Sequence, residues 1–316
     1  MPSRAEAESV EKSLLAESLR LLRELGFRVS TPSESRRASL DVVARRERAL
    51  VVAKAVEDVD KVSEGLSVEL RKVASALSAT PLLIAGRKSG EVVEEGVAYE
   101  KLGVWAVAPT TLSEAARGDG PYVYSKLGRY YVKIDGERLR AARVRRGLSL
   151  GDLARMVGVS RKAIYEYERG GMDATLEVAV RMEEVLESSL ALPVDIFTPP
   201  TARPPARDEG GRDVDPLERE VMSKIRKLGF EAFHFRKAPF NIIARSRRNR
   251  LLIRVSERLD KRTERGLKVV RSMADVSESL SLTIVKEDAS VEEQGLLAYE
   301  EFKRVRSEPE LVKIIG

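Results

Sequence analysis

The chain has 316 residues, a formal net charge of +6, no cysteine and a single histidine, His234. The lack of cysteine excludes disulfides and Cys-ligated zinc or iron–sulfur sites. One histidine argues against a multi-histidine metal site or a Ser–His–Asp triad. The charged N-terminus does not read as a signal peptide, and the apolar stretches are too short to cross a bilayer. We therefore expect a cytoplasmic protein with no membrane partner, no metal and no cofactor.

Residues 1–120 alternate between helical and strand patterns. The patterns predict helices near 6–25 and 59–78 and strands near 27–31, 39–46, 49–56 and 81–86. A mixed sheet flanked by helices follows from this order. A Gly-rich and polar stretch from Pro109 to Pro121 then breaks the pattern.

Residues 121–134 read as a β-hairpin. Val123 and Val132 flank a turn near residues 126–129, where Gly128 is able to adopt a positive φ. Tyrosines cluster on both predicted strands, and cross-strand aromatic pairing explains them. We expect this hairpin to connect the first domain to the next one.

Residues 135–198 show helical spacing and no β pattern. Asp135 is placed to cap the first helix, and Ser149 with Asp152 forms a capping-box-like pair at the start of the second. Gly158 allows a sharp turn before a third helix that Ser160 caps, and the Gly170–Gly171 pair ends that helix. A short helix, a tight turn and a following helix predict a helix-turn-helix.

This segment strongly resembles the lambda-repressor/Cro-type helix-turn-helix family. The match runs through LRAARVRRGLSLGDLARMVGVSRKAIYEYERG, residues 139–170. The resemblance places the third helix in the major groove of DNA, with its outward residues near base edges. The predicted DNA-binding residues are Ser149, Ser160, Arg161, Lys162, Tyr165 and Glu166. Of these, Ser149 contacts phosphate through its backbone amide, and Arg161 and Lys162 suit guanine acceptors.

Arg143 and Glu168 receive a structural interpretation. In the family that the segment resembles, the matching Arg and Glu pair across the first and third helices. We predict a buried bracing pair that does not read bases. The surrounding charge fits a polyanion partner, because residues 136–170 hold nine basic and four acidic side chains.

The chain contains an internal repeat, whose two copies lie about 200 residues apart. A Pro-, Gly- and charge-rich linker at residues 199–216 precedes the second copy. Four segments of the first copy match four of the second: LLRELGF (21–27) with KIRKLGF (224–230), DVVARR (41–46) with NIIARS (241–246), LVVAK (50–54) with RLLIR (250–254), and GVAYEKL (96–102) with GLLAYEEF (295–302). Agreement at four separate places indicates a duplication.

Each copy resembles the Holliday-junction-resolvase and restriction-endonuclease-like fold. In that fold an Asp ends one strand, an acid-x-Lys pair lies on the next, and the acids hold Mg²⁺. Asp41 and Lys54 match two of these positions in the first copy, but Val52 replaces the middle acid. In the second copy Asn241, Leu252 and Arg254 replace all three positions. Because Mg²⁺ needs carboxylate oxygens, we expect no catalytic residue and no enzymatic activity.

The predicted fold class is α/β, with two repeated restriction-endonuclease-like domains flanking an all-α Cro/repressor-type domain. The predicted segments are 1–120 (degenerate nuclease-like domain), 121–134 (hairpin connector), 135–198 (helix-turn-helix domain), 199–216 (linker) and 217–316 (second degenerate nuclease-like domain). This order also looks like that of an archaeal family of helix-turn-helix transcriptional regulators. The resemblance covers nearly the whole chain, although only the central module has a specific motif.

The function that we predict is sequence-specific binding of double-stranded DNA by a transcriptional regulator. One alternative is a Mg²⁺-dependent DNA nuclease or resolvase-like enzyme using Asp41 and Lys54. Another is an architectural protein that binds DNA non-specifically. We predict a homodimer, since one recognition helix covers only half an operator; the alternative is that the two copies pair inside one chain. The nuclease-like copies serve dimerisation, auxiliary DNA contact, or binding of an unidentified small-molecule or protein effector.

Overall fold

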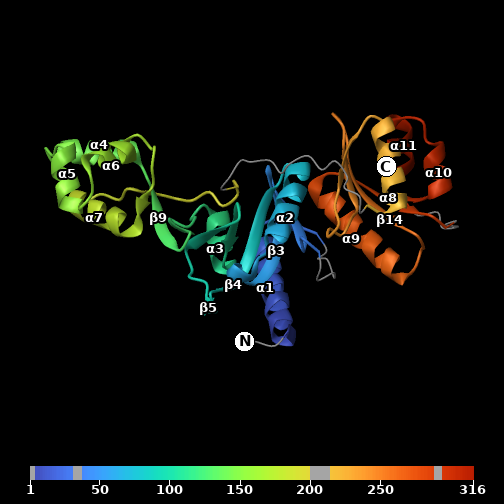
Figure 1. Ribbon diagram of the computed structural model, residues 1–316, viewed down its shortest axis with the longest axis horizontal. Helices are drawn as coiled ribbons and strands as arrows, with labels where there is room; N and C mark the ends of the chain where they lie inside the picture. The colour runs from blue at the N-terminus through green and yellow to red at the C-terminus, as the bar shows by residue number, and fades with distance from the viewer. Residues whose placement is uncertain (1–3, 31–37, 200–213, 288–293) are drawn as a thin grey trace. The chain divides into compact units, whose positions relative to one another are not determined.

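A computed structural model describes residues 4–30, 38–199, 214–287 and 294–316. The chain packs as two compact units (Figure 1). One unit combines residues 1–18, 56–61 and 84–200, and the other combines residues 19–55, 62–83 and 201–316. The second unit therefore holds most of both repeats, and the first holds the helix-turn-helix module.

The first repeat contains the predicted helices and strands, and it also has three strands and a helix between residues 91 and 117 that were not predicted; the helix lies where a break was expected from Pro109 onward. Its elements are α1 (Arg4–Glu24), β1 (Arg28–Val29), β2 (Val42–Arg46), β3 (Ala49–Asp58), the 3₁₀ helix η1 (Val59–Lys61), α2 (Glu64–Leu77), β4 (Thr80–Lys88), β5 (Glu91–Val92), β6 (Val97–Lys101), β7 (Val104–Val107) and α3 (Pro109–Arg117). The predicted helix over 59–78 is shorter at its start, because the Ser63 side chain accepts a hydrogen bond from the Leu66 amide and caps α2 there.

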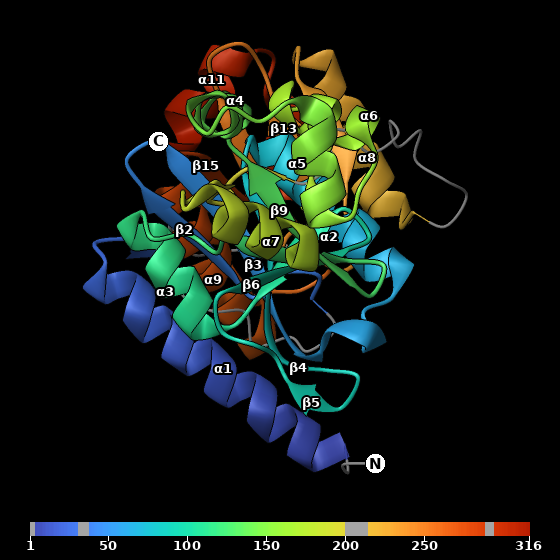
Figure 2. The same cartoon turned by 90° about the vertical axis from the view of Figure 1, so that its left-hand side faces the viewer.

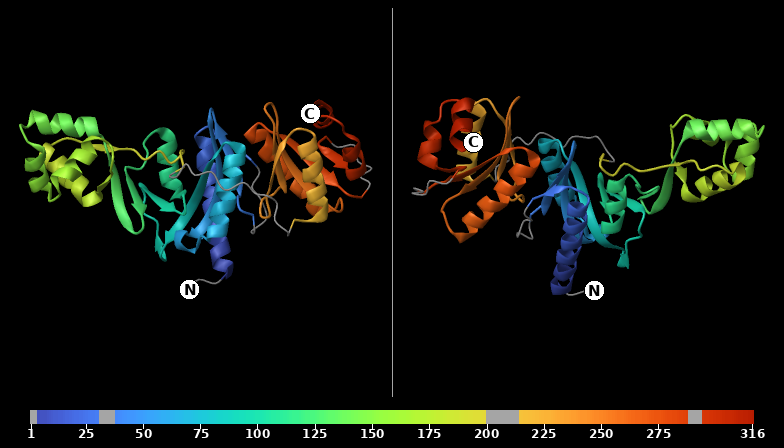
Figure 3. Two further views of the ribbon diagram at one scale, coloured as in Figure 1. Left: turned by 45° about the horizontal axis from the view of Figure 1, so that its top comes forward. Right: turned by 180° about the vertical axis from the view of Figure 1, so that it is seen from behind.

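The second repeat forms a separate sheet. Its elements are α8 (Pro216–Lys227), β12 (Glu231–His234), β13 (Ile242–Arg245), β14 (Arg250–Ser256), α9 (Lys261–Ser277), β15 (Leu280–Val285), β16 (Leu296–Ala298), α10 (Tyr299–Arg304) and α11 (Glu308–Ile315). The strand order is β12-β13-β14-β15-β16. Side chains of α8, α10 and α11 share one apolar core on one face of this sheet, and α9 packs against β14 and β15 (Figure 3).

The two repeats share local geometry at a constant offset of 200 residues. Val42 pairs with Ala53 between β2 and β3, as Ile242 pairs with Ile253 between β13 and β14. The equivalent helices α2 and α9 both end at a residue with positive φ, Ser78 in one and Glu278 in the other. The sequence repeat is thus also a structural repeat over these elements.

The repeats diverge after the fourth matched strand. Tyr99 lies in β6, whereas Tyr299 begins helix α10. In the larger sheet the order is β1-β2-β3-β4-β7-β6-β8-β9-β10, with β5 on β4 and β11 on β9. β7 therefore takes the place beside β4 that β16 takes beside β15. The matched tyrosines are equivalent in sequence but not in structure, because the first repeat has an additional strand, β6.

The remaining elements belong to the hairpin and the helical module. They are β8 (Val123–Lys126), β9 (Arg129–Ile134), α4 (Gly136–Arg145), α5 (Leu150–Val157), α6 (Arg161–Glu168), β10 (Ala174–Thr175), α7 (Leu176–Leu186) and β11 (Ala191–Leu192). The hairpin has the predicted register, with Val123 opposite Val132, and both central turn residues, Leu127 and Gly128, have positive φ. That conformation is typical of a tight type I′ turn.

Two short strands in the helical module were not predicted. β10 and β11 each contain two residues, and both pair with β9 in antiparallel fashion. A two-residue strand is too short to show an alternating pattern, so sequence periodicity had no means of detecting it. The module is therefore helical with short strands at one edge, and α7 packs against β9 (Figure 2). No helix in the described part of the chain is long and apolar enough to cross a membrane.

Candidate nucleic-acid interface

The two helices of the helix-turn-helix begin and end at the predicted residues. Ser149 caps α5, and with Asp152 it forms a complete capping box. α5 ends at Gly158, which has a φ of 78°, and Ser160 then caps α6 by accepting a hydrogen bond from the Ala163 amide. Glycine adopts this left-handed conformation without steric cost, which allows the sharp turn between the helices.

The inner faces of the helices pack into one core. Leu139 of α4, Leu153 and Val157 of α5 and Ile164 of α6 are all fully buried, and Tyr167 is nearly so. Helical periodicity then directs the side chains between these core positions toward solvent. The outward face of α6 consequently carries the residues that we predicted to contact DNA.

The predicted base-contacting residues differ in their surroundings. Arg161 and Lys162 are exposed in the first turn of α6, and neither makes an ion pair with any residue that the structure describes. Tyr165 is 44% exposed and accepts a hydrogen bond from Arg169, whose guanidinium also lies over its ring. The Glu166 carboxylate lies against Gly171. Arg161 and Lys162 are therefore available to bind an anion or hydrogen-bond acceptors of a partner.

Arg143 and Glu168 form a two-armed ion pair between α4 and α6. The Arg143 Nε atom lies 2.5 Å from Glu168 Oε1, and its second nitrogen lies 3.1 Å from Oε2. The remaining nitrogen donates to the Leu148 carbonyl at 2.8 Å. The side chains are only 11% and 8% exposed. Such a pair fixes the position of α6 relative to α4 and is not free to read bases.

Gly136, which sequence reasoning missed, allows the first turn of α4 to lie against the backbone at the end of α6. A Cβ atom there would lie 2.4 Å from the Glu168 carbonyl oxygen and 2.7 Å from that of Tyr167. Only a glycine permits the start of α4 to approach the end of α6 so closely. A Gly directly after a predicted N-cap was the available signal, but it does not reveal which element lies nearby.

Electrostatics at the helix starts favour anions. Hydrogen bonds from Ser149, followed by Arg155, lower the pKa of Asp152 to about 2, so its carboxylate is ionised and committed to the cap. The N-termini of α5 and α6 carry the positive end of the helix dipole. Together with the surplus of basic side chains in residues 136–170, this arrangement suits contact with a phosphate backbone.

The nuclease-type position of the first repeat is filled by its own residues. Lys54 Nζ lies 2.8 Å from one oxygen of the Asp41 carboxylate, and the Ala55 amide donates to the other oxygen at 2.8 Å. Burial raises the pKa of Asp41, and Lys54 opposes this rise. Val52 contributes no oxygen at the middle position. These residues do not fit a Mg²⁺ site, which needs several free oxygen ligands.

The second repeat keeps the geometry but changes the chemistry. The Asn241 side-chain oxygen accepts from the Val255 amide at 2.8 Å, as Asp41 accepts from Ala55. Its amide nitrogen donates to Glu218, which also lies 2.6 Å from His234 Nε2. Sequence reasoning missed this Glu218–Asn241–His234 network. Among the described residues no group of three His, Cys, Asp or Glu side chains is placed to hold a metal.

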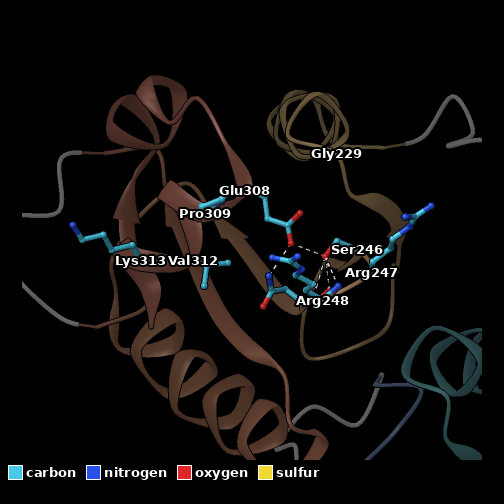
Figure 4. A pocket seen from close by; sticks show the side chains of 9 residues that line it. Gly229, Ser246, Arg247, Arg248, Glu308, Pro309, Val312 and Lys313 are labelled. Atoms are coloured by element: carbon cyan, nitrogen blue, oxygen red, sulfur yellow. Dashed lines mark hydrogen bonds between the residues drawn. The ribbon is translucent and has the colours of Figure 1, made fainter.

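A cavity of about 650 Å³ lies between the β13–β14 turn and α11 in the second repeat. Figure 4 shows the Glu308 side chain directed at this turn. One Glu308 oxygen accepts hydrogen bonds from the Ser246 hydroxyl at 2.6 Å and the Asn249 amide at 2.7 Å. The carboxylate thus joins α11 to the turn, which gives it a structural role.

The two folds identify the class of protein. Residues 11–121 match the PD-(D/E)XK superfamily domain, and residues 139–192 match the helix-turn-helix domain. The fold class predicted from the sequence is confirmed: a mixed α/β chain with a nuclease-type domain and a helix-turn-helix. The chain is a DNA-binding protein of the helix-turn-helix class.

Whole-length relatives narrow this class to one family. A protein from Pyrococcus horikoshii is 37% identical over 84% of both chains, and one from Thermococcus kodakarensis is 35% identical over 93% of this chain and 92% of its own. A third, from Methanocaldococcus jannaschii, is 32% identical over 96% and 95%. Each is named "Putative HTH-type transcriptional regulatory protein". The chain belongs to this archaeal family of HTH-type transcriptional regulatory proteins, as its motifs predicted.

One solved structure, the SINR protein/SINI protein complex, is similar to part of the chain. The match covers 30% of this chain and 82% of the other, with 20% identity and a TM-score of 0.16. A TM-score this low carries no argument about function.

Proposed function

We propose that this protein regulates transcription by sequence-specific binding of double-stranded DNA through a Cro/repressor-type module, with α6 as the recognition helix. The observation that carries the proposal is the first turn of α6, where Arg161 and Lys162 are exposed and unpaired among the described residues. Arg and Lys recognise the major-groove acceptors of guanine. Ser149 and Ser160, at adjacent helix starts, position backbone amides for phosphate contact.

The test is selection of bound sequences from random duplex DNA, followed by affinity measurements at one fixed salt concentration. Arg161→Ala is expected to weaken binding to the selected site by about 1–3 kcal/mol and to relax selectivity at one base pair. Arg117→Ala, which removes an exposed arginine from α3, serves as the matched control and should leave affinity unchanged. Selection that yields no preferred sequence would support the architectural alternative.

The segment boundaries, the homodimer and the lack of catalysis belong to the same proposal. We infer the division 1–120, 121–134, 135–198, 199–216 and 217–316 from the sequence pattern. Two chains on a pseudo-palindromic site would supply two recognition helices about 34 Å apart. The engaged Asp41 carboxylate and the missing middle acid support a nuclease-type domain that does not cut.

A further inference from the structure

A reciprocal contact joins the two repeats within the unit formed by residues 19–55, 62–83 and 201–316. Helix α9 of the second repeat packs against β2 of the first. The Arg45 side chain, on β2, donates hydrogen bonds to the carbonyls of Val276 at 2.9 Å and Ser277 at 3.3 Å, which are the last residues of α9. A cation at the C-terminus of a helix satisfies carbonyls that have no partner within the helix.

The same contact occurs in the opposite direction. Arg250, at the start of β14, donates to the carbonyl of Leu77, the last residue of α2, at 2.5 Å. In the strand registers, Arg45 lies opposite Leu50 in the first repeat, and Arg245 lies opposite Arg250 in the second. The two arginines therefore occupy the same rung of equivalent hairpins, on opposite strands. Each repeat thus caps the C-terminus of one helix of the other, α9 in one direction and α2 in the other.

Further contacts surround this pair of caps. Lys72 of α2 donates to the His234 carbonyl at 2.8 Å and lies over the Phe235 ring. The Glu69 carboxylate accepts from the backbone amides of Arg236 and Lys237 at 2.9 and 3.3 Å. The second repeat thus contacts α2 through a loop as well as through β14.

Charges of both signs lie where the two caps meet. Burial and the like charges of Arg45 and Arg245 lower the pKa of Arg250, and Glu278 opposes this. Glu278 also forms ion pairs with Arg45 at 3.1 Å and with Arg28 at 3.3 Å. A carboxylate from the second repeat therefore compensates arginines of the first, which is the complementarity expected of a specific interface.

We propose that the two nuclease-type repeats form an intramolecular dimer through this reciprocal helix-end contact. The partner that fits the surface of α2 and β2 is the second repeat of the same chain, not a second chain. A homodimer of this protein, where it forms, would have to use another surface. This inference does not depend on DNA recognition, so its test is separate from that of the proposed function.

The experiment uses the full chain with a protease site placed within residues 200–213 and cut after folding. The two fragments are expected to elute together in equal amounts and at the mass of the uncut protein, whether that is one chain of 35.1 kDa or the proposed homodimer. Arg45→Glu should weaken their association about tenfold or more, because it removes charged hydrogen bonds and places a carboxylate beside helix-end carbonyls. Adding Glu278→Arg to that variant should restore part of the association, which a variant that merely misfolds would not do.

Arg258→Glu is the matched control. It reverses a charge in an ion pair with Glu287 inside the second repeat, and the cut fragments should stay together. Separation of the wild-type fragments at micromolar concentration would overturn the proposal. A second result would also overturn it: the uncut wild-type protein has the mass of two chains, and the uncut Glu278→Arg variant has the mass of one. The surface would then join separate molecules.

Discussion

At the scale of residues, the module depends on a few polar groups with little exposure. The guanidinium of Arg143 satisfies both oxygens of Glu168 and one backbone carbonyl. Both side chains are largely buried. The net stabilisation from such a pair is small, but removing one partner leaves the other as an unpaired buried charge, which costs far more.

We predict that Arg143→Ala destabilises the protein by about 3–5 kcal/mol, since Glu168 would remain as an uncompensated buried carboxylate. Thermal unfolding of the full chain measures this effect. Arg155→Ala, which breaks an exposed pair with Asp152, should change stability far less. An unchanged melting temperature for Arg143→Ala would show that the pair does not brace the helices.

A second residue-scale prediction concerns Asp152. Its pKa is lowered to about 2 in the folded protein, below the usual value near 3.9 of an unfolded chain. Its stabilising effect is therefore present above about pH 4 and is lost as the pH falls toward 2. Asp152→Asn should lower stability at neutral pH and make unfolding less sensitive to acid in that window. Melting curves of both proteins between pH 2 and 6 test this, and parallel curves would contradict it.

At the scale of elements, the close contact of α4 with α6 depends on Gly136. We predict that Gly136→Ala destabilises the module, because its Cβ would meet backbone carbonyl oxygens of α6 that have little room to move. Gly151→Ala is the matched control: it also lies near a helix start, but its Cβ would meet only the Ser149 hydroxyl oxygen at 3.6 Å. Circular-dichroism melts should show a loss for the first variant and no loss for the second.

Local chemistry explains which elements could be predicted. Helix caps such as Ser149, Ser160 and Gly158 depend on neighbouring residues, and the structure places all three as expected. The short strands β10 and β11 depend on pairing with β9, where Ala174 meets Val132 and Ala191 meets Ile134. These partners are far apart in the sequence, so no local pattern encodes the two strands. The Glu218–Asn241–His234 network was missed for the same reason.

In the candidate site, too, some features could be predicted from the sequence and others could not. Arg161 and Lys162 lie exposed on α6 because the helical period places them outside the core. The period does not say that the Glu166 carboxylate lies against Gly171, or that Tyr165 contacts Arg169. Side-chain contacts of this kind depend on rotamers and tertiary neighbours, which residue spacing alone does not specify.

At the scale of the whole molecule, the chain has a nuclease-type domain in which Val52 stands where the motif has its middle acid. We predict that the full chain leaves duplex and four-way-junction DNA uncut in Mg²⁺ or Mn²⁺, because Asp41 is held by Lys54 and the Ala55 amide. Gel assays with long incubation measure this. Cleavage that disappears in Lys54→Ala would instead establish the nuclease alternative.

The strand β9 has a consequence for how the module meets its target. β9 lies between β8 and β10, and it also pairs with β11 of the helical module. Backbone hydrogen bonds, rather than a free tether, thus attach the helices to the sheet. A flexibly tethered module loses rotational freedom when it binds DNA. Here that freedom is lost on folding, so the entropic cost of binding DNA is smaller. The orientation of the helices relative to β9 is therefore set when the protein folds and not when it meets DNA.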